Sequence, residues 1–247
     1  MRGCNLRCPY CYNTELVAPS KALQDQDAAA IENQSQAQDA GAQADRDQPQ
    51  FVFIQDIIDH LKKRANVLSG FVISGGEPLL HPDTARQLIL QARSLGYKIK
   101  LDTNGMFPDR LQELLSDKAC APDYIALDVK TSPARYGELS QAQDAAAAQS
   151  SASYSSSQKI IQSIKIISAL PTNAREFRTV LYPPLVGRAE IEEITSILPK
   201  DARWFFAHFL NGRCLSAAAE KVQPYTEDQE AALVDFARSF IPGAELR

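Results

Sequence analysis

Short apolar segments alternate with amphipathic stripes along most of this chain, and the alternation constrains its fold more than any other feature. Strand-like segments lie at 70–74, 99–102, 124–128, 177–181 and 204–208. Around them, apolar residues recur at helical spacing in the segments 54–61, 88–95, 111–115, 160–164, 191–198 and 233–240. Strands that alternate with helices form βαβ units with parallel strands. The sequence therefore predicts an α/β fold around a parallel sheet, with ligands bound at the carboxyl ends of its strands.

Two segments interrupt this pattern with sequences that are rich in Ala and Gln. The segment 18–50 has Leu23 and Ile31 as its only large apolar residues, and the segment 140–158 has Tyr154 alone. Neither segment carries enough apolar surface to offset the entropy that is lost when a chain becomes ordered. We therefore expect both to be disordered or loosely helical insertions within a single domain that spans 1–247.

The composition excludes some classes of function but does not identify one. The 247 residues are 45% hydrophobic, which is enough for a sizeable core, and the net charge is -4. An acidic chain argues against a general nucleic-acid binder, which is normally basic. The sequence has no apolar run of the roughly 20 residues that span a membrane, and no apolar signal-peptide core. Five cysteines without an export signal are typical of reduced thiols in the cytoplasm.

Three of the cysteines lie close together at the start of the chain. Cys4, Cys8 and Cys11 have the spacing C-x3-C-x2-C, and so short a loop can turn all three thiolates toward one centre. A structural zinc site needs four protein ligands, whereas an iron–sulfur cube held by three cysteines leaves one iron open for a substrate or cofactor. One alternative is a zinc site completed by Cys120, Cys214 or a histidine, and a disulfide is a weaker alternative in a reducing compartment.

The cysteine motif, with Tyr10 directly before its third cysteine, resembles the cluster motif of the radical S-adenosylmethionine (SAM) superfamily. Further matches follow in the order of that family, and the segment 74–78 (Ser-Gly-Gly-Glu-Pro) resembles its GGE motif. The segments 101–105 (Leu-Asp-Thr-Asn-Gly) and 127–130 (Leu-Asp-Val-Lys) resemble later strand ends in the activating enzymes of glycyl-radical enzymes. The resemblance is greatest to activating proteins of anaerobic ribonucleoside-triphosphate reductases, and it covers nearly the whole chain apart from the two insertions.

The resemblance implies a partial (β/α)6 radical SAM barrel and an enzyme that uses SAM with a [4Fe-4S] cluster held by Cys4, Cys8 and Cys11. Such an enzyme cleaves SAM reductively and places a radical on a glycine of a partner, here one like anaerobic ribonucleotide reductase. The implied partners are that glycyl-radical enzyme and an electron donor such as flavodoxin or ferredoxin. Radical SAM chemistry on a small molecule is the alternative within enzymes, and a catalytically inactive metal-binding remnant is the alternative outside them.

The resemblance also assigns roles to residues that follow the predicted strands. Gly75 and Gly76 let the backbone approach a ligand closely, and with the Glu77 carboxylate they would meet the ammonium group of SAM. Lys130 points to the same side of an extended segment as Asp128 and would neutralise the carboxylate of SAM. A turn is the simpler explanation for the diglycine sequence when it stands alone.

Two aspartates end neighbouring predicted strands. Carboxylates that face one crevice repel each other unless a cation lies between them, and the resemblance allows a monovalent cation bound by Asp102, Thr103 and Asp128. Asn104 belongs to the same motif and is included among the cofactor-binding residues. A helix N-cap is the structural alternative for each aspartate.

Three more residues are candidates for the cofactor site. Arg178 lies in an apolar strand, where it either faces the inside of the barrel with an anionic partner or faces outward with its stem packed. His208 ends a strand at a position where similar activating enzymes contact SAM, although a structural histidine is the alternative. Tyr10 would support the adenine side of SAM.

The start of the sequence departs from the family pattern. The family's cysteine loop follows a first barrel strand, but only Met1, Arg2 and Gly3 precede Cys4. At about 3.3 Å per residue these residues span about 10 Å, which is too short for a strand. Either the start codon is misassigned or the first strand is truncated or missing. We expect its loss to expose the edge of the neighbouring strand and to leave the cysteine loop without an anchor.

Overall fold

The computed structural model describes residues 1–17, 52–140 and 154–247. Its centre is a six-stranded sheet in the order β1-β2-β3-β4-β5-β6, and all five pairings between neighbours are parallel. The strands are β1 (Gly70–Ile73), β2 (Lys98–Thr103), β3 (Tyr124–Asp128), β4 (Arg175–Val180), β5 (Trp204–Ala207) and β6 (Ala244–Leu246). The predicted α/β fold with a parallel sheet is confirmed, in the form of a partial barrel.

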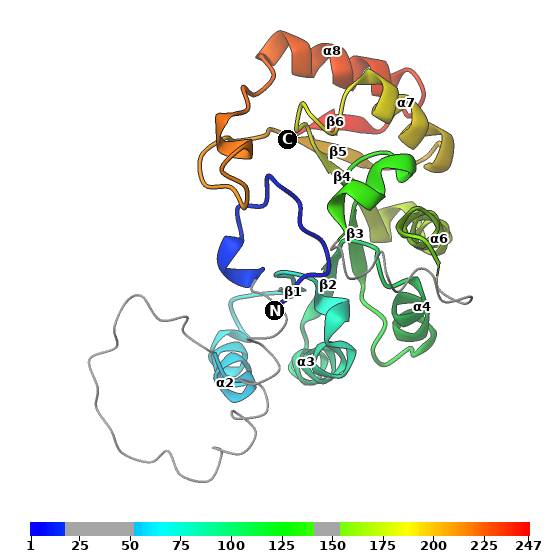
Figure 1. Ribbon diagram of the computed structural model, residues 1–247. Coiled ribbons are helices and arrows are strands. Elements are labelled where there is room, and N and C mark those ends of the chain that lie inside the picture. Colours follow the sequence, from blue (N-terminus) through cyan, green and yellow to red (C-terminus); the bar gives the residue numbers. More distant parts are fainter. Residues whose placement is uncertain (18–51, 141–153) are drawn as a thin grey trace.

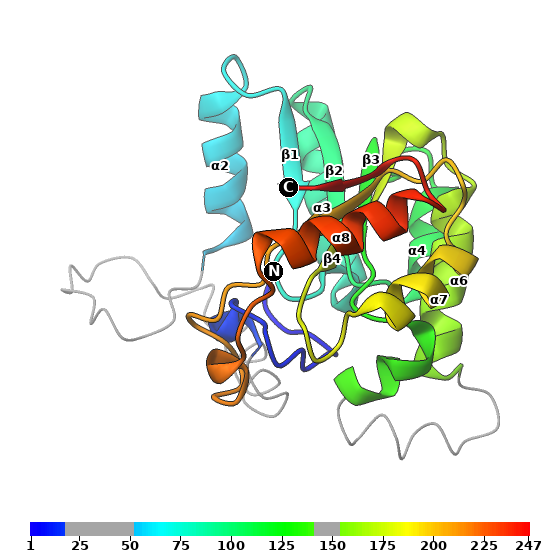
Figure 2. The same ribbon diagram turned by 90° about the horizontal axis from the view of Figure 1, so that it is seen from above.

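The helix α2 (Ile54–Arg64) precedes β1. Successive strands are connected by helices, as parallel pairing requires, and these are α3 (Pro82–Ser94), α4 (Pro108–Ser116), α6 (Ser156–Ser168), α7 (Arg188–Ile197) and α8 (Glu227–Arg238). In Figure 1 these helices lie around the outside of the curved sheet, and the N-terminal segment lies on its inner side. Figure 2 shows α2 beside β1, at one edge of the sheet. No helix in the described part of the chain is both long and apolar enough to cross a membrane.

Local sequence signals explain where several helices begin. Proline stands at the start of α3 and α4, where its fixed φ suits the first turn and its missing N–H is not needed. Capping boxes start α6 at Ser155 and α8 at Thr226, which satisfies N–H groups that would otherwise lack partners. The apolar faces of the helices cover the sheet, and the largest fully buried side chain between them is Trp204.

The strands were predicted within one or two residues, with one exception. The strand β6 was not predicted, because Ala244–Leu246 has only three residues and no apolar run. It pairs with β5, and residue Arg247 donates its backbone N–H to Phe206 O at 2.9 Å. A strand this short is specified by its partner strand and not by its own sequence.

The predicted second insertion, 140–158, includes residues at both of its ends that take part in secondary structure. Ser140 forms a bridge with Leu6, and Ser156–Gln158 belong to the first turn of α6. The Ser155 hydroxyl accepts the Gln158 N–H at 3.2 Å. The composition of the segment does not predict this capping hydrogen bond. The predicted first insertion, 18–50, and the interior of the second lie outside the described residues.

The cysteine loop is anchored, contrary to the expectation from the sequence. No strand precedes β1 in the described residues, and β1 is an edge strand whose Val72 is 51% exposed. Residues Met1 and Gly3 nevertheless pair with the segment after β1, since the N–H groups of Gly76 and Glu77 donate to Met1 O and Gly3 O, each at 2.8 Å. Backbone hydrogen bonds thus hold this segment without a full strand.

Candidate functional site

A cavity of about 660 Å³ lies at the carboxyl ends of the strands, between the cysteine loop and the sheet. Parallel α/β sheets bind ligands at this edge because the loops after neighbouring strands meet there. All predicted site residues except Glu77 line the cavity. They are Cys4, Cys8, Tyr10, Cys11, Gly75, Gly76, Asp102, Thr103, Asn104, Asp128, Lys130, Arg178 and His208. The structure therefore brings together residues that are separated by up to two hundred positions in sequence.

The three cysteines come from one turn-rich loop. The Cys11 N–H donates to Cys8 O at 3.0 Å, and Cys4 Sγ accepts from the Leu6 N–H at 3.4 Å. Burial raises the pKa of the Cys8 thiol to about 12, and burial also raises the pKa of Cys4. A buried thiol of this kind keeps its proton until a metal replaces it.

The donor set fits an iron–sulfur cluster better than a closed zinc site. The thiols of Cys4, Cys8 and Cys11 all line the same cavity. A structural zinc site needs a fourth protein ligand, but neither Cys120 nor Cys214 lines the cavity, and His208, which does, is hydrogen-bonded through Nδ1 to Glu230. Across the described residues no three His, Cys, Asp or Glu side chains already stand at metal-binding positions. The three thiols would therefore turn toward a common centre when a cluster assembles.

The diglycine bend makes room for the chain's own N-terminal segment. Gly75 has φ +136°, and a Cβ added there would lie 2.2 Å from Met1 O. A Cβ on Gly76 would lie 1.9 Å from Gly3 O, far inside the distance that atoms tolerate. The sequence predicted a close backbone approach at these glycines, but the approaching group is the segment Met1–Gly3. Both glycines also line the cavity.

Glu77 has a different position from the predicted one. Its carboxylate is fully buried and accepts hydrogen bonds from Leu79 N at 2.9 Å, Thr103 Oγ1 at 2.8 Å and Asn104 N at 2.7 Å. Burial raises the pKa of Glu77 to about 7, against the lowering effect of these donors. The carboxylate ties the loop after β1 to the loop after β2, which corrects the predicted contact between Glu77 and the ammonium group of SAM.

Four charged side chains form a chain of ion pairs along one wall of the cavity. Lys130 Nζ lies 2.9 Å from Asp128 Oδ2, and Arg178 Nε lies 2.7 Å from Asp128 Oδ1. Arg178 Nη1 lies 3.1 Å from Asp102 Oδ2. Arg178 thus faces the inside of the barrel, and its guanidinium lies where the sequence allowed a cation bound by the two aspartates. Thr103 donates to Glu77 instead of facing such a cation.

The ion pairs keep Asp128 and Lys130 charged. Burial alone would raise the pKa of Asp128, but the charges of Lys130 and Arg178 outweigh burial and hold this pKa below its ordinary value. Burial alone would lower the pKa of Lys130, but the charge of Asp128 raises it above its ordinary value. An anionic ligand group would therefore meet two permanent cations at this wall.

Aromatic side chains form another part of the site. The Tyr10 ring lies 5.0 Å from the Tyr182 ring, which in turn lies 4.8 Å from the Phe209 ring. The Tyr10 hydroxyl is buried and has no hydrogen-bond partner among the described residues. Phe209 and Val180 also line the cavity and were not among the predicted site residues. Phe209 directly follows the predicted strand 204–208, whereas Val180 lies within the predicted strand 177–181 and is the last residue of β4.

His208 lines the cavity at the end of β5 and has an unpredicted partner. Its Nδ1 lies 2.6 Å from Glu230 Oε2, and the Glu230 side chain on α8 is only 4% exposed. The sequence carried no signal for this pair, because the two residues are 22 positions apart on different elements.

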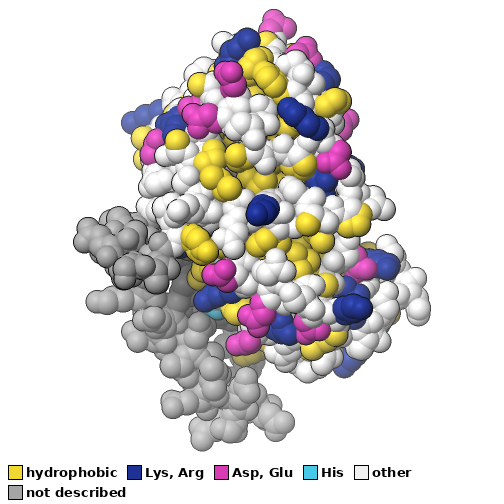
Figure 3. Space-filling view, turned by 90° about the vertical axis from the view of Figure 1, so that its right-hand side faces the viewer, with side chains coloured by type: hydrophobic (Ala, Val, Ile, Leu, Met, Phe, Trp, Pro, Cys, Tyr) yellow, Lys and Arg dark blue, Asp and Glu magenta, His cyan; other side chains and the backbone are white. Residues whose placement is uncertain are grey.

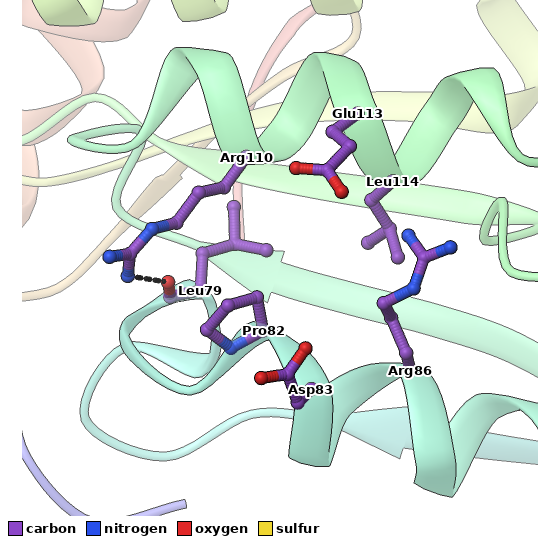
Figure 4. Close-up of a pocket in the computed structure, with 7 residues that line it drawn as sticks. All are labelled: Leu79, Pro82, Asp83, Arg86, Arg110, Glu113 and Leu114. Atoms are coloured by element: carbon purple, nitrogen blue, oxygen red, sulfur yellow. Dashed lines mark hydrogen bonds between the residues drawn. The ribbon is translucent and has the colours of Figure 1, made fainter.

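A second hollow between α3 and α4 is too small for a cofactor. It has a volume of about 80 Å³ (Figure 4), which is room for a few water molecules. Arg110 beside it donates to Leu79 O at 2.7 Å and to Leu80 O at 3.1 Å, so this cation holds a neighbouring loop. On the face drawn in Figure 3, basic and acidic side chains are interspersed among the described residues.

Comparisons with known proteins identify the family and the fold. The sequence model of the radical SAM superfamily matches residues 1–170. The curated protein "Putative glycyl-radical enzyme activating enzyme MJ1227" of Methanocaldococcus jannaschii is 29% identical over 195 residues, which cover 78% of this chain and 63% of that protein. The chain thus spans less than two thirds of this relative. The solved structure of TYW1 with a lysine-pyruvate adduct bound is similar in fold, with a TM-score of 0.51 and 13% identity over 96% of this chain and 70% of that one.

Proposed function

The chain belongs to the radical SAM superfamily, and we propose that it is an activating enzyme that generates a glycyl radical on a partner enzyme. One observation carries this proposal. Three thiols of a single loop, the diglycine bend and a wall with two cations line the same cavity. This combination suits a cofactor that has a metal-chelating amino acid at one end and a nucleoside at the other.

Cys4, Cys8 and Cys11 would hold a [4Fe-4S] cluster with one iron left free of protein ligands. When bound, the cluster supplies the electron that splits the sulfonium carbon–sulfur bond of SAM. The protein's own contribution is to bind, orient and shield the reacting groups. The thiolates act as ligands here and not as nucleophiles.

The charged wall would bind the amino-acid end of SAM. Lys130 and Arg178 offer cationic donors to the carboxylate of SAM, while Asp128 holds both cations in place through its two oxygens. Backbone polar groups at Gly75 and Gly76 would meet the ammonium group. A monovalent cation bound by Asp102 and Asp128 would first have to displace the Arg178 guanidinium.

The aromatic side of the cavity would bind the nucleoside end of SAM. Tyr10 and Phe209 provide ring surfaces, and the half-exposed His208 provides a polar group beside them. Asn104 contacts the cysteine loop, since its Nδ2 donates to Asn5 Oδ1 at 3.0 Å and approaches Cys4 Sγ at 3.6 Å. Asn104 would therefore hold the cysteine loop close to the charged wall.

The partner would be a glycyl-radical enzyme similar to anaerobic ribonucleotide reductase, and the electron donor would be a flavodoxin or ferredoxin. The name of the M. jannaschii relative supports this class of partner. All five cysteines are free, which supports a reducing compartment such as the cytoplasm.

Anaerobic reconstitution with iron and sulfide tests the proposal. We expect about four irons per chain, as a [4Fe-4S] cluster requires, and 5′-deoxyadenosine formed from SAM only when a reductant is present. Cys8→Ser should lose the iron and the product, whereas the control Cys120→Ser, which replaces a buried thiol outside the cavity, should keep both. One bound zinc without SAM cleavage would contradict the proposal.

A second measurement separates the glycyl-radical activity from chemistry on a small molecule. The reconstituted protein, SAM, a reductant and an anaerobic ribonucleotide reductase are mixed and examined by electron paramagnetic resonance. The expected result is a glycyl radical on the reductase. SAM cleavage without any such signal would favour a small-molecule substrate.

A further inference from the structure

The contact between His208 and Glu230 joins the cavity to a helix that has no other part in the site. Glu230 lies in the first turn of α8, and its side chain is almost fully buried. Within the described part of the chain, its carboxylate makes one side-chain hydrogen bond, to His208 Nδ1 at 2.6 Å. The His208 side chain is 49% exposed and lines the cavity.

The chemistry of the pair determines where the imidazole hydrogen lies. A carboxylate only accepts hydrogen bonds, and a neutral imidazole carries one N–H. Because the carboxylate has no hydrogen to donate, the hydrogen in the contact between Glu230 and His208 belongs to the imidazole. Nδ1 therefore carries the hydrogen, and Nε2 is left with a free lone pair.

We propose that Glu230 is a positioning residue that fixes His208 as the Nδ1–H tautomer, so that Nε2 presents a hydrogen-bond acceptor to the cavity. Since Nδ1 faces α8, Nε2 lies on the opposite, accessible edge of the ring. A hydrogen-bond acceptor at Nε2 favours a ligand group that donates a hydrogen bond, such as a ribose hydroxyl. The assignment of the ligand rests on the proposed function, whereas the assignment of the tautomer does not.

Nuclear magnetic resonance of the protein without cofactors tests the tautomer. Long-range ¹H–¹⁵N spectra at alkaline pH distinguish the two neutral forms, and the chain has only three histidines. We expect the Nδ1–H form for His208 in the unmodified protein. Observation of the Nε2–H form of His208 in the unmodified protein would overturn the proposal, regardless of the results with the variants.

Two variants of similar size separate positioning from packing. Glu230→Met removes the acceptor and should return His208 to the Nε2–H form, which a neutral imidazole prefers in water. Glu230→Gln is the matched control, because its amide oxygen still accepts from Nδ1 and should keep the Nδ1–H form. An Nδ1–H form that persists in Glu230→Met would overturn the role of Glu230.

Calorimetry with S-adenosylhomocysteine on the reconstituted protein tests the ligand. Glu230→Met should bind this nucleoside about tenfold more weakly than the unmodified protein, equivalent to about 1.4 kcal/mol, and Glu230→Gln should bind it within about twofold. Equal affinity of all three proteins would overturn the ligand assignment. Failure of the unmodified protein to bind would instead count against the proposed function, while the spectra still decide the tautomer.

Discussion

Arg178 Nε lies 2.7 Å from Asp128 Oδ1, and the two residues are direct partners in the register of β4 and β3. Residues opposite each other on one face of a sheet lie close together, so the pairing of the strands itself creates this ion pair. The same guanidinium reaches Asp102 on β2. Three strands are thus tied together at the edge where the cavity opens.

Arg178→Met should destabilise the protein and weaken cofactor binding. The substitution leaves Asp102 and Asp128 next to each other with one cation fewer, and loss of one partner of a buried ion pair costs about 3–5 kcal/mol. Because Arg178 is 29% exposed, we expect a smaller loss of about 2 kcal/mol in the free energy of unfolding. Urea denaturation measures this loss.

Arg213→Met is the control for that experiment. Arg213 forms an ion pair with Glu15 at 2.9 Å, but its side chain is 63% exposed. Exposed pairs contribute little to stability, so the unfolding transition should hardly move. Equal effects of the two substitutions would show that the buried network does not stabilise the sheet.

Gly76→Ala should detach the N-terminal segment from the loop after β1. The new methyl group would lie 1.9 Å from Gly3 O, so the hydrogen bond from Glu77 N to Gly3 O would be lost. Overpacking of this kind typically costs about 1–3 kcal/mol. Thermal denaturation should report the loss, and hydrogen exchange at the Glu77 amide should become faster.

Gly137→Ala serves as the matched control, because a Cβ at Gly137 meets no atom within 4 Å. Its melting temperature should stay close to that of the unmodified protein. If Gly76→Ala behaves in the same way, the N-terminal segment does not pack against the diglycine bend as described.

Glu77→Gln should change how stability depends on pH. The pKa of Glu77 is raised from 4.5 to about 7 in the folded protein, so the folded state binds this proton more tightly than the unfolded state. The resulting stability is present below pH 4.5 and is lost as the pH rises toward 7. The glutamine does not titrate and avoids this loss.

Urea denaturation of both proteins at pH 5 and pH 8 measures the effect. The stability of Glu77→Gln relative to the unmodified protein should increase between these pH values by on the order of 2 kcal/mol. The side-chain amide of the variant accepts fewer hydrogen bonds than the carboxylate, and this loss lowers the stability of the variant equally at both pH values. A constant difference between the proteins would contradict a raised pKa.

Ser155→Ala should weaken the start of α6. The Ser155 hydroxyl accepts the Gln158 N–H, and the Gln158 side chain accepts the Ser155 N–H at 2.9 Å. Loss of such a cap costs about 1 kcal/mol, which chemical denaturation can resolve. Ser157→Ala, two residues further along in the first turn of the same helix, removes no capping hydrogen bond among the described residues and should be nearly neutral.

The sequence predicted the elements of the fold and most members of the site. Alternation of apolar segments gave five of the six strands, and each strand end marked a cavity residue such as Asp102, Asp128 or His208. These predictions depend on local pattern and on the rule that parallel strands end at one edge. The direction in which a side chain points depends on tertiary contacts, so the sequence could not distinguish the two possible orientations of Arg178.

Other features depended on contacts between distant segments. The role of Glu77 follows from donors on the loop after β2, and the partner of His208 comes from α8. The anchor of the cysteine loop is a set of backbone hydrogen bonds, which no side-chain pattern records. By itself the sequence determined which chemical groups gather at the cavity, because periodicity and motifs are properties of short segments. Only the tertiary structure decided which of them face the cavity and which hold it together, because burial and pairing are set by neighbours far along the chain.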